Sequence, residues 1–511
     1  MDKELDNIIE KIVYTCESWI KRKNGFLFLE DPIEKKEISA HYAVSHISVA
    51  FIIYGTTQKK DKIFKIGYEL LESLLFKWNK ICEMLEFHND FNNFALCVVE
   101  KYLDSNRDKK LLMKIREVIL KTPDSNHQTI NWLPMRAYVN LCRYNWSKEK
   151  KFYIEYQKCR KDIKAATFED GFIEDRLPKG LSFNLQYDVA TVAVMQFMKS
   201  IDLNIDLTNE FNALINVISP DGDINYLGRG TNQIFAWGLW IYLASSAGDL
   251  EYKRAVNYLK ERVDIILKNN NLMLNNWKGQ EKYLWWDYHY CSVYTAHLLF
   301  WLILAQKDYK KYPIYRKKDY NFKESGIEVK SNHNFFIAIF NGRNEYLAEK
   351  GPIITNLWIN GIGNVVKGSF GPWQGSFGKK YLNIDVINNF FGLMKVDYKT
   401  EIFNNRILKK LNIYRKKEFI KYTPYFLPID IEIKEEKLII KWISQLSEEK
   451  YLNIPVLYKS KEFLSNIKLF VDNINIPLEE NMMIKNQYDW CLLVKSRICT
   501  GKEWKLEIKN N

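Results

Sequence analysis

A helical segment that recurs about every 50 residues constrains the fold of this chain more than any other feature. From the first residue to about residue 305 the apolar spacing is typical of amphipathic helices, with little of the alternation typical of strands. Blander helical patterns separate the recurring segments, and two helices with their loops occupy about one period. The period therefore predicts a repeated helical hairpin. The six recurring segments mix polar and aromatic residues with small ones, and they lie near His41, Asn92, Asn131, Tyr187, Gln233 and His289.

Six hairpins can close into a ring, and we expect this arrangement for residues 1–310. In such an (α/α) toroid, six inner helices line a cavity and six outer helices face solvent. The polar residues of the recurring segments would then belong to inner helices whose ends meet at one mouth. An open solenoid is the alternative. The large domain of a different kind that follows the sixth unit favours the closed ring.

The sequence changes character after a basic, proline-containing linker that runs from Gln306 to Lys323. Beyond this linker, short runs alternate apolar and polar residues and are broken by Gly, Asn and Asp, which is typical of an antiparallel sheet. We expect residues 311–511 to form a β-sandwich, which makes the chain an α+β multidomain protein. The clearest runs are residues 334–340, 356–366, 429–443, 467–472 and 504–510.

The formal net charge of +13 favours a polyanionic partner through long-range attraction. The lysines are scattered and no nucleic-acid-binding signature is present, so an acidic polysaccharide fits this charge better than nucleic acid does. The 15 Trp, 31 Tyr and 29 Phe residues suit a large helical core, and aromatic faces also line sugar-binding clefts. The charge and the aromatic content together favour a carbohydrate partner.

The cysteines, the apolar runs and the first residues bear on cofactors and on cellular location. The eight cysteines show no CxxC pair and no zinc spacing, so we expect reduced core thiols and no metal or cofactor. No apolar run reaches membrane-spanning length, and the first residues form an amphipathic helical pattern rather than a signal peptide. We therefore expect a cytoplasmic monomer, or a secreted or periplasmic protein if a signal has been removed.

The motif "GRGTNQ", from Gly228 to Gln233, places an arginine between two glycines before an apolar helical pattern. Its spacing matches neither a phosphate-binding P-loop nor a dinucleotide-binding fingerprint. A guanidinium at a helix start is suited to an anion, because the positive end of the helix adds to its charge. We therefore predict that Arg229 binds an anionic group.

Three motifs carry a resemblance to a known group of enzymes. They are "NWLPMR" from Asn131, "DGFIEDRLPKGLSFNLQYD" from Asp170, and "GRGTNQ". A helical domain followed by a sheet domain, with these motifs in this order and at this spacing, resembles the polysaccharide lyases of the hyaluronate, chondroitin AC and xanthan lyase group. Heparinase II/III-like and alginate lyases share the plan. The resemblance implies an (α/α) toroid, a β-sandwich, and cleavage of a uronic-acid polymer by β-elimination.

The pattern of histidines departs from that group. Where the lyases place a histidine soon after the Asp-Gly pair, this chain has Asp175 and Arg176. The heparinase-like relatives instead use an adjacent Asn-His pair and a histidine in the sandwich. Here Asn126-His127 and His333 are similar to those residues.

β-Elimination removes a weakly acidic proton beside a carboxylate, so hydrogen-bond donors must stabilise the charge that develops there. The resemblance assigns carboxylate binding to Asn131 and Arg229, and proton transfer to Tyr187 as base, acid or both. His127 and His289 are the alternative bases, because imidazole titrates near neutrality. The spacing of His127 and Asn131 would put both on one face of one helix. We also expect four residues to bind substrate, namely Asn126, Gln233, Trp132 and Trp286.

Two other functions fit the same chain. A glycoside hydrolase would need a pair of carboxylates, and a non-catalytic glycan-binding protein would keep the cleft without turnover. Asp-Gly pairs such as Asp170-Gly171 and Asp221-Gly222 are more often turns than acids in a site. The carboxylates available to a hydrolase are Asp170, Asp175, Asp188, Asp221, Asp223 and Asp287.

Overall fold

The structure is a computed structural model, and the chain divides into two units. The first unit comprises residues 1–179 and 183–315, and the second comprises residues 180–182 and 316–511. The structure describes residues 3–32, 35–37, 41–78, 88–177, 179, 184–227, 233–267, 291–305, 312, 314–316, 319–340, 355–366, 371–372, 393–395, 419–421, 429–443, 450–485, 490–498 and 503–510.

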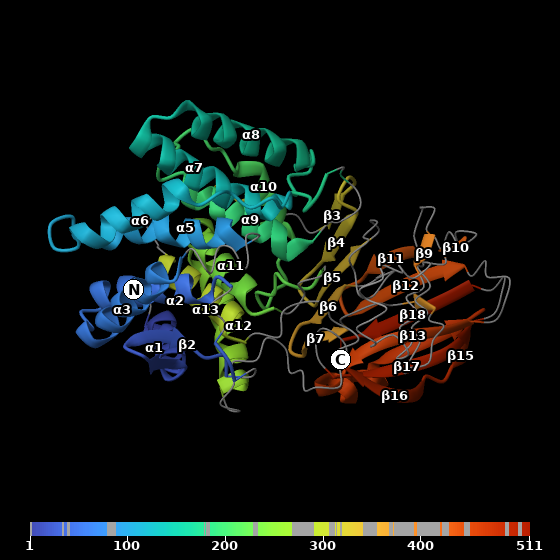
Figure 1. Cartoon of the computed structure of the whole chain (residues 1–511). Coiled ribbons are helices and arrows are strands. Elements are labelled where there is room, and N and C mark those ends of the chain that lie inside the picture. The colour runs from blue at the N-terminus through green and yellow to red at the C-terminus, as the bar shows by residue number, and fades with distance from the viewer. Residues whose placement is uncertain are drawn as a thin grey trace. The chain divides into compact units, whose positions relative to one another are not determined.

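Six helices of the first unit, which Figure 1 labels, have side chains that are buried along most of their length. They have almost no polar face, so they must be covered on every side. Each contacts the next along the chain, and the last contacts the first, so the six form a closed ring. Each lies in one of the six recurring segments. They are α2 (Ala43–Thr57), α5 (Asn89–Val99), α7 (Leu133–Ser147), α9 (Leu185–Met198), α11 (Phe235–Ala247) and α13 (Cys291–Leu304).

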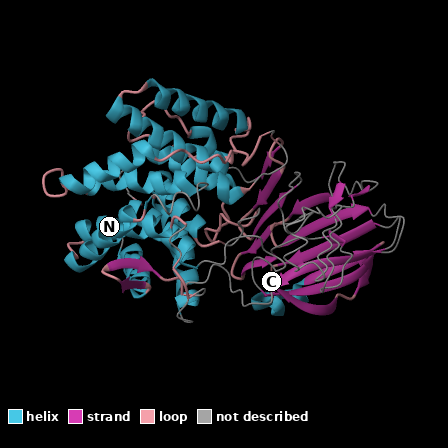
Figure 2. Ribbon diagram, in the orientation of Figure 1, coloured by secondary structure: helices cyan, strands magenta, loops and turns pink. Residues whose placement is uncertain are grey.

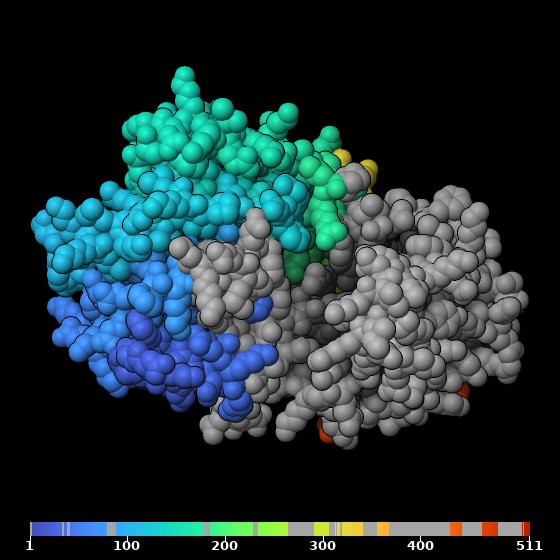
Figure 3. Space-filling model, viewed as in Figure 1, coloured from blue at the N-terminus to red at the C-terminus, as the bar shows by residue number. Residues whose placement is uncertain are grey.

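A second set of helices surrounds this ring, and the exposed sides of α6 and α8 are visible in Figure 3. Five of them pack against the ring helix that precedes them, while α1 packs against α13. α1 and α6 bury one apolar stripe each, at the three- and four-residue spacing of an amphipathic helix. The set is α1 (Lys3–Ser18), α3 (Asp61–Phe76), α6 (Lys109–Lys121), α8 (Lys150–Ala166), α10 (Thr208–Val217) and α12 (Asp249–Leu267).

The period of the sequence is visible in the hydrogen bonds between neighbouring ring helices. Side chains that bond across adjacent ring helices lie one period apart in sequence. The separations are 47 residues for Ser45 with Asn92, 46 for Asp90 with Arg136, 47 for Gln186 with Gln233, and 50 for Gln196 with Ser246. Equivalent positions of successive hairpins are therefore in contact, as a repeated unit requires.

One element of the first unit was not expected, because the sequence was judged helical throughout this region. β1 (Ile20–Lys23) and β2 (Phe26–Leu29) form an antiparallel hairpin directly after α1. Its turn is Asn24-Gly25, with φ of 51° and 83°. An Asn-Gly turn with two positive φ angles is the strongest short-range signal for a hairpin, so the sequence did contain this information.

The second unit consists of antiparallel sheets, shown as magenta arrows in Figure 2. Each of the five runs predicted to contain strands does contain one. Among the described residues the larger sheet contains β3 (Asp319–Phe322), β4 (Ile327–Ser331), β5 (Phe335–Phe340), β6 (Asn356–Ile359), β7 (Gly363–Val366), β8 (Gly371–Pro372), β13 (Lys450–Leu457), β16 (Glu479–Lys485) and β17 (Trp490–Ile498). The smaller contains β11 (Ile429–Ile433), β12 (Lys437–Ile443), β14 (Ile467–Val471), β15 (Ile474–Ile476) and β18 (Glu503–Lys509), and β9 (Leu393–Lys395) pairs with β10 (Phe419–Lys421).

The two larger sheets share one apolar core. Phe335 and Ile337 of β5 belong to the same cluster of buried side chains as Leu438 of β12 and Leu469 of β14. The Lys330 ammonium also reaches across from β4 and donates to the carbonyl oxygen of Ile431 in β11, at 2.8 Å. The sheets are therefore packed through their apolar faces.

A buried carboxyl group holds the first and last parts of the helical unit together. Asp31, which follows β2 and is buried, accepts hydrogen bonds from the backbone N–H and the hydroxyl of Ser292, at 2.9 and 2.6 Å. Ser292 lies in the first turn of α13, where the N–H groups have no partner within the helix. Asp31 therefore caps the helix that completes the ring.

We expect Asp31→Ala to lower the free energy of unfolding by about 2–3 kcal/mol, because it leaves a buried N–H and a buried hydroxyl without an acceptor. Ser292→Ala keeps the backbone bond and removes only the hydroxyl, so its expected cost is about 1 kcal/mol. Urea denaturation of the two variants measures both values. Equal losses in the two variants would contradict the capping role.

Candidate functional site

The amino-terminal ends of the six ring helices lie together. His41, just before α2, and His88, just before α5, approach with their Nδ1 atoms 3.1 Å apart. In the first turn of α5, Asp90 accepts a bond of 2.9 Å from Arg136, which lies in the first turn of α7. The short helix η3 (Ile130–Trp132), which leads into α7, contacts α9. These contacts join the starts of α2, α5 and α7 and bring them to α9.

The remaining helix starts complete the circle. The Gln186 amide, at the start of α9, donates to Gln233 just before α11, at 2.8 Å. Phe235, the first residue of α11, stacks on His297 of α13 with ring centroids 4.9 Å apart. The His297 ring in turn lies 5.5 Å from that of Tyr42, which precedes α2. All six helices therefore direct the same end, with its partial positive charge, to one side of the ring.

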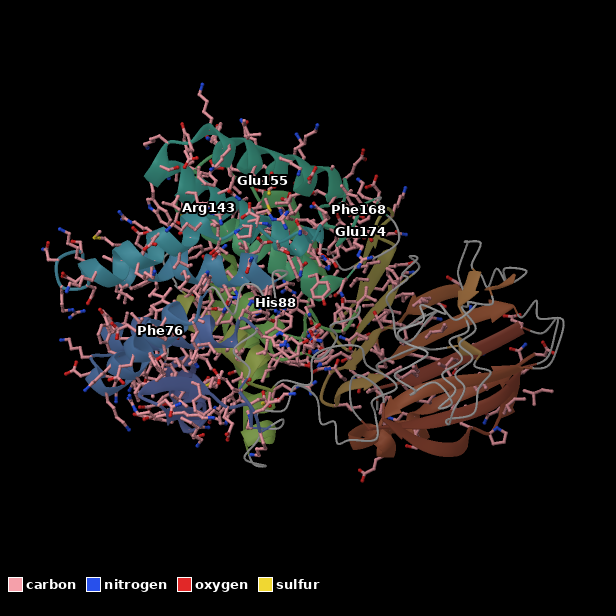
Figure 4. The ribbon with its side chains drawn as sticks, viewed as in Figure 1. Phe76, His88, Arg143, Glu155, Phe168 and Glu174 are labelled. Atoms are coloured by element: carbon pink, nitrogen blue, oxygen red, sulfur yellow. The ribbon has the colours of Figure 1, made fainter. Side chains whose placement is uncertain are left out.

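Rings from these helix starts form one connected group, which we call the aromatic–histidine cluster. Each ring centroid lies within 6.1 Å of at least one other. Figure 4 labels His88 at the amino-terminal end of α5. Five of the chain's seven histidines belong to it. Its members are His41, Tyr42, His46, His88, Phe91, His127, Trp132, Phe235, Tyr294 and His297.

Burial keeps several of these imidazoles neutral. Desolvation lowers the pKa of His41 to about 4, with a further contribution from the positive charge of Lys36. Desolvation lowers the pKa of His46 to about 3, although its bond to the carbonyl oxygen of Tyr42 opposes the shift. Burial also lowers the pKa of His297 well below its ordinary value. At neutral pH these imidazoles therefore carry no charge, and each binds a proton more weakly than a solvent-exposed histidine does.

Asn131 and Trp132 lie in η3, at the edge of this cluster. Asn131 is buried, and its Oδ1 accepts no hydrogen bond from the described residues. The half-buried Trp132 ring lies 4.6 Å from His127 and 5.2 Å from Phe91, measured between centroids. A buried amide oxygen without a donor is costly unless a ligand supplies one. The two residues thus combine an unused polar group with an aromatic face.

The expectation that His127 and Asn131 share a face of one helix is wrong. α7 begins only at Leu133, with Pro134 in its first turn, and Asn131 lies in η3. His127 lies in the exposed loop before η3, where the hydroxyl of Thr129 bonds to its Nδ1 at 2.5 Å. The proline fits the first turn of a helix, so it fixes the start of α7 after these residues.

The loop of Asn126 and His127 is held by buried charges. Arg136 donates to the carbonyl oxygens of Ser125 and His127, at 2.7 and 2.6 Å, while it pairs with Asp90. Asp90 also accepts the backbone N–H of Ser125 at 3.1 Å. This pair therefore fixes the position of an exposed loop that carries two of the predicted site residues.

Tyr187 and Gln233 also lie at the helix starts. Tyr187 is half-buried in the first turn of α9, next to Gln186. Gln233 is buried, accepts the Gln186 amide and donates to the hydroxyl of Tyr294 at 3.4 Å. The structure therefore brings Asn131, Trp132, His127, Tyr187 and Gln233 to one end of the ring. The predictions for Arg229, His289 and Trp286 fall outside the described residues.

Two of the aspartates considered for a hydrolase lie in turns, and a third is buried at the start of a helix. Gly171 and Gly222, with φ of 96° and 98°, lie in tight turns after Asp170 and Asp221. Asp188 in the first turn of α9 is buried, and desolvation raises its pKa well above the usual value, against an opposing contribution from the backbone N–H of Ile173. Burial therefore favours the protonated form of this carboxyl group more than solvent would. Asp287 falls outside the described residues.

Sequence reasoning missed the centre of this site. It selected His127 and His289 but not His41, His46, His88 or His297. A signal was present, because His41 and His88 occupy equivalent positions just before two successive ring helices, 47 residues apart. Comparing the six recurring segments at their helix starts would have found them.

The described part of the chain has neither a metal-binding cluster nor a membrane-spanning helix. It contains no group of three or more His, Cys, Asp or Glu side chains placed to hold a metal ion. None of its helices has the length and apolar character needed to cross a membrane. Five cysteines of the described part form no disulfide there.

No family model and no curated protein matches this sequence. Among solved structures, the chain is similar to the α-1,6-mannanase GH76A from Salegentibacter sp. HEL1_6, at 11% identity and a TM-score of 0.42, over 59% of this chain and 99% of the other. It is similar to a possible GH105 family member from Salmonella enterica serovar Paratyphi A, at 11% identity and 0.40, over 59% and 93%. It is also similar to a polysaccharide lyase, at 8% identity and 0.36, over 59% and 96%.

The neutral histidines make the stability of the fold depend on pH. An unfolded histidine binds a proton below about pH 6.5, whereas His46 in the fold binds one only near pH 3. The fold is therefore not weakened by these histidines above about pH 6.5. As the pH drops below this value, each such group lowers the free energy of unfolding by about 1.4 kcal/mol per pH unit. Asp90 acts in the opposite direction, because burial raises its pKa to about 6.

We therefore expect His46→Gln to flatten the dependence of unfolding free energy on pH between about pH 6 and 4, relative to the unchanged protein. The comparison cancels Asp90 and the other acids, which are the same in both proteins. Denaturant titrations at several pH values measure the two slopes. Equal slopes for the two proteins would show that the fold does not lower the pKa of His46.

Proposed function

We propose that this protein is a lyase that cleaves an acidic, uronic-acid-containing polysaccharide by β-elimination. On this proposal residues 1–310 form a six-hairpin (α/α) toroid that carries the site, and residues 311–511 form a β-sandwich. One observation carries the proposal: six helix starts converge on a cluster of neutral histidines and aromatic rings. Such a place can attract an anion, hold a sugar ring and accept a proton.

The anion of the substrate would be its carboxylate. Six positive helix ends favour negative charge at this side of the ring, and the net charge of +13 draws an acidic polymer to the protein. The Asn131 side chain lies there, and its amide group can hydrogen bond to the uronate carboxyl group. Arg229 is proposed as the charged donor, because its motif leads into α11, the fifth ring helix. These donors would stabilise the enolate-like intermediate as charge moves onto the carboxylate.

The sugar ring would stack on an exposed aromatic face. Trp132 is half-buried, with its ring next to those of His127 and Phe91, so it offers such a face at the edge of the cluster. Asn126 and Trp286 are proposed to bind neighbouring sugars. Gln233 is bonded on both sides, to Gln186 and Tyr294, and would fix the start of α11 as well as contact substrate.

Tyr187 is proposed to take the proton beside the carboxylate, to return a proton to the leaving oxygen, or to do both. Its position in the first turn of α9 puts it at the same end of the ring as Asn131, whose helix η3 contacts α9. Neutral imidazoles of the cluster, or His289, can serve as the second proton-transfer group.

We expect a product that absorbs in the near ultraviolet when the protein is incubated with one of hyaluronan, chondroitin, heparan, alginate or a xanthan-type polymer, because elimination creates a conjugated uronate. On the polymer that reacts fastest, Tyr187→Phe should lower turnover by about 10²–10⁴-fold. Asn131→Ala should lower kcat more than it raises KM, because its bond strengthens as charge develops.

Tyr153→Phe is the matched control, since Tyr153 lies on α8 in the outer set of helices and is exposed. Its turnover should equal that of the unchanged protein. A Tyr187→Phe variant with full turnover would remove Tyr187 from the mechanism. Cleavage without an absorbing product would indicate a hydrolase, and binding without cleavage a glycan-binding protein.

A further inference from the structure

Two histidines of the cluster share a direct hydrogen bond between their rings. The Nδ1 atoms of His41 and His88 are 3.1 Å apart, and the ring planes are inclined by 54°. Both side chains are buried, with exposed fractions of 8% and 1%. They come from equivalent positions just before α2 and α5, so the repeat itself brings the two rings next to each other.

A bond between two Nδ1 atoms requires unlike forms of the two rings. One Nδ1 must carry the proton, and the other must offer its lone pair. Burial holds His41 neutral at ordinary pH, because its pKa is lowered to about 4. If His41 donates through Nδ1, its Nε2 is a proton acceptor, and if it accepts there, its Nε2 carries a proton. The position of one proton therefore decides whether His41 is a base or an acid.

We propose that His41 and His88 form a proton relay that serves the elimination. The inference rests on the proposed function, and neither residue belongs to the site that the resemblance assigns. His41, the more exposed of the two, faces the substrate, and His88 lies behind it.

The transfer balances without any further reagent. Nε2 of His41 takes the proton that leaves the carbon beside the carboxylate, and the Nδ1 proton of His41 passes to Nδ1 of His88. The proton on Nε2 of His88 stays in place, so His88 carries the additional proton until the transfer is reversed. The electron pair of the broken C–H bond forms the double bond, and the bond to the leaving oxygen breaks. Tyr187 donates its hydroxyl proton to that oxygen, and the reverse transfer through the pair then restores the proton of Tyr187.

The surroundings fix the rings in place. His88 lies against the edge of Tyr42, with centroids 5.2 Å apart, and within 6.1 Å of Phe91 and Trp132. Tyr42 stacks on Phe91 at 4.5 Å. These aromatic rings keep water from the Nδ1–Nδ1 bond and restrict rotation of both imidazoles. A relay needs both conditions, because its proton must pass between the two rings and not to solvent.

The bond can be tested without substrate. In protein with ¹⁵N-labelled histidine, a scalar coupling between the two Nδ1 nuclei through the hydrogen bond is the expected result. The coupling should vanish in both His41→Asn and His88→Asn and persist in His333→Asn, whose ring is exposed in the second unit. Absence of the coupling in the unchanged protein would overturn the relay.

The relay itself is tested by kinetics on the uronate polymer that gives the fastest elimination. Asparagine at position 88 can still bond to Nδ1 of His41 but cannot pass a proton on. We expect His88→Asn to lower kcat by about 10²–10⁴-fold with little change in KM. A merely positioning His88 would tolerate this change, so a kcat within about threefold of the unchanged protein would overturn the relay.

A second kinetic measurement separates one moving proton from two. If both protons move in the rate-limiting step, the rate should curve as the deuterium fraction of the solvent rises, and the His88→Asn variant should give a straight line. A straight line for the unchanged protein would contradict the relay. Because the ¹⁵N coupling needs no turnover, a protein that shows the coupling but forms no absorbing product would overturn the proposed function and not the hydrogen-bonded pair.

Discussion

The burial of six helices that lack a polar face is the constraint on which the first unit depends. All eleven residues of α5 and all thirteen of α11 are buried. Such helices cannot stand at a surface, so each must be covered by its two neighbours in the ring and by a helix outside it. Because the outer helix of each hairpin returns the chain to the same end, successive ring helices run in the same direction. Their amino-terminal ends therefore meet as a direct consequence of the repeated hairpin.

This parallel arrangement also explains where the polar residues occur. A buried polar group without a partner costs about 1–3 kcal/mol, so the polar side chains of the ring helices need partners. Near the carboxy-terminal ends of α9 and α11, Gln196 bonds to Ser246. At the helix starts, backbone N–H groups and neighbouring helix starts supply partners, and Ser45 with Asn92 and Gln186 with Gln233 use them. Close packing is strict elsewhere. A Cβ on Gly67 of α3 would lie 2.7 Å from the Cβ of Phe51 in α2, so only glycine fits between these helices.

The repeat and the strands could be predicted from the sequence because both rest on local apolar spacing. The six segments contain the six ring helices, and the five alternating runs contain strands. The hairpin at Asn24-Gly25 was not predicted, although Asn-Gly is a known hairpin turn, because the residues around it show a helical pattern. The site was predictable only in part. Motifs selected Asn131 and Trp132, which the structure places at this end of the ring, whereas the His41–His88 bond joins residues 47 apart and exists only when two helix starts meet.

The same geometry gives the site its chemical character. Burial discourages a histidine at this place from taking a proton, and the positive charge of Lys36 adds to this effect at His41. His41 therefore stays neutral where a solvent-exposed histidine would be partly charged. A carboxylate brought to this place would meet helix ends that stabilise its charge, next to imidazoles that carry no charge. Anion binding and proton acceptance usually compete for positive charge. Here the positive potential comes from backbone dipoles, while burial lowers the pKa of the imidazoles and leaves them uncharged at neutral pH.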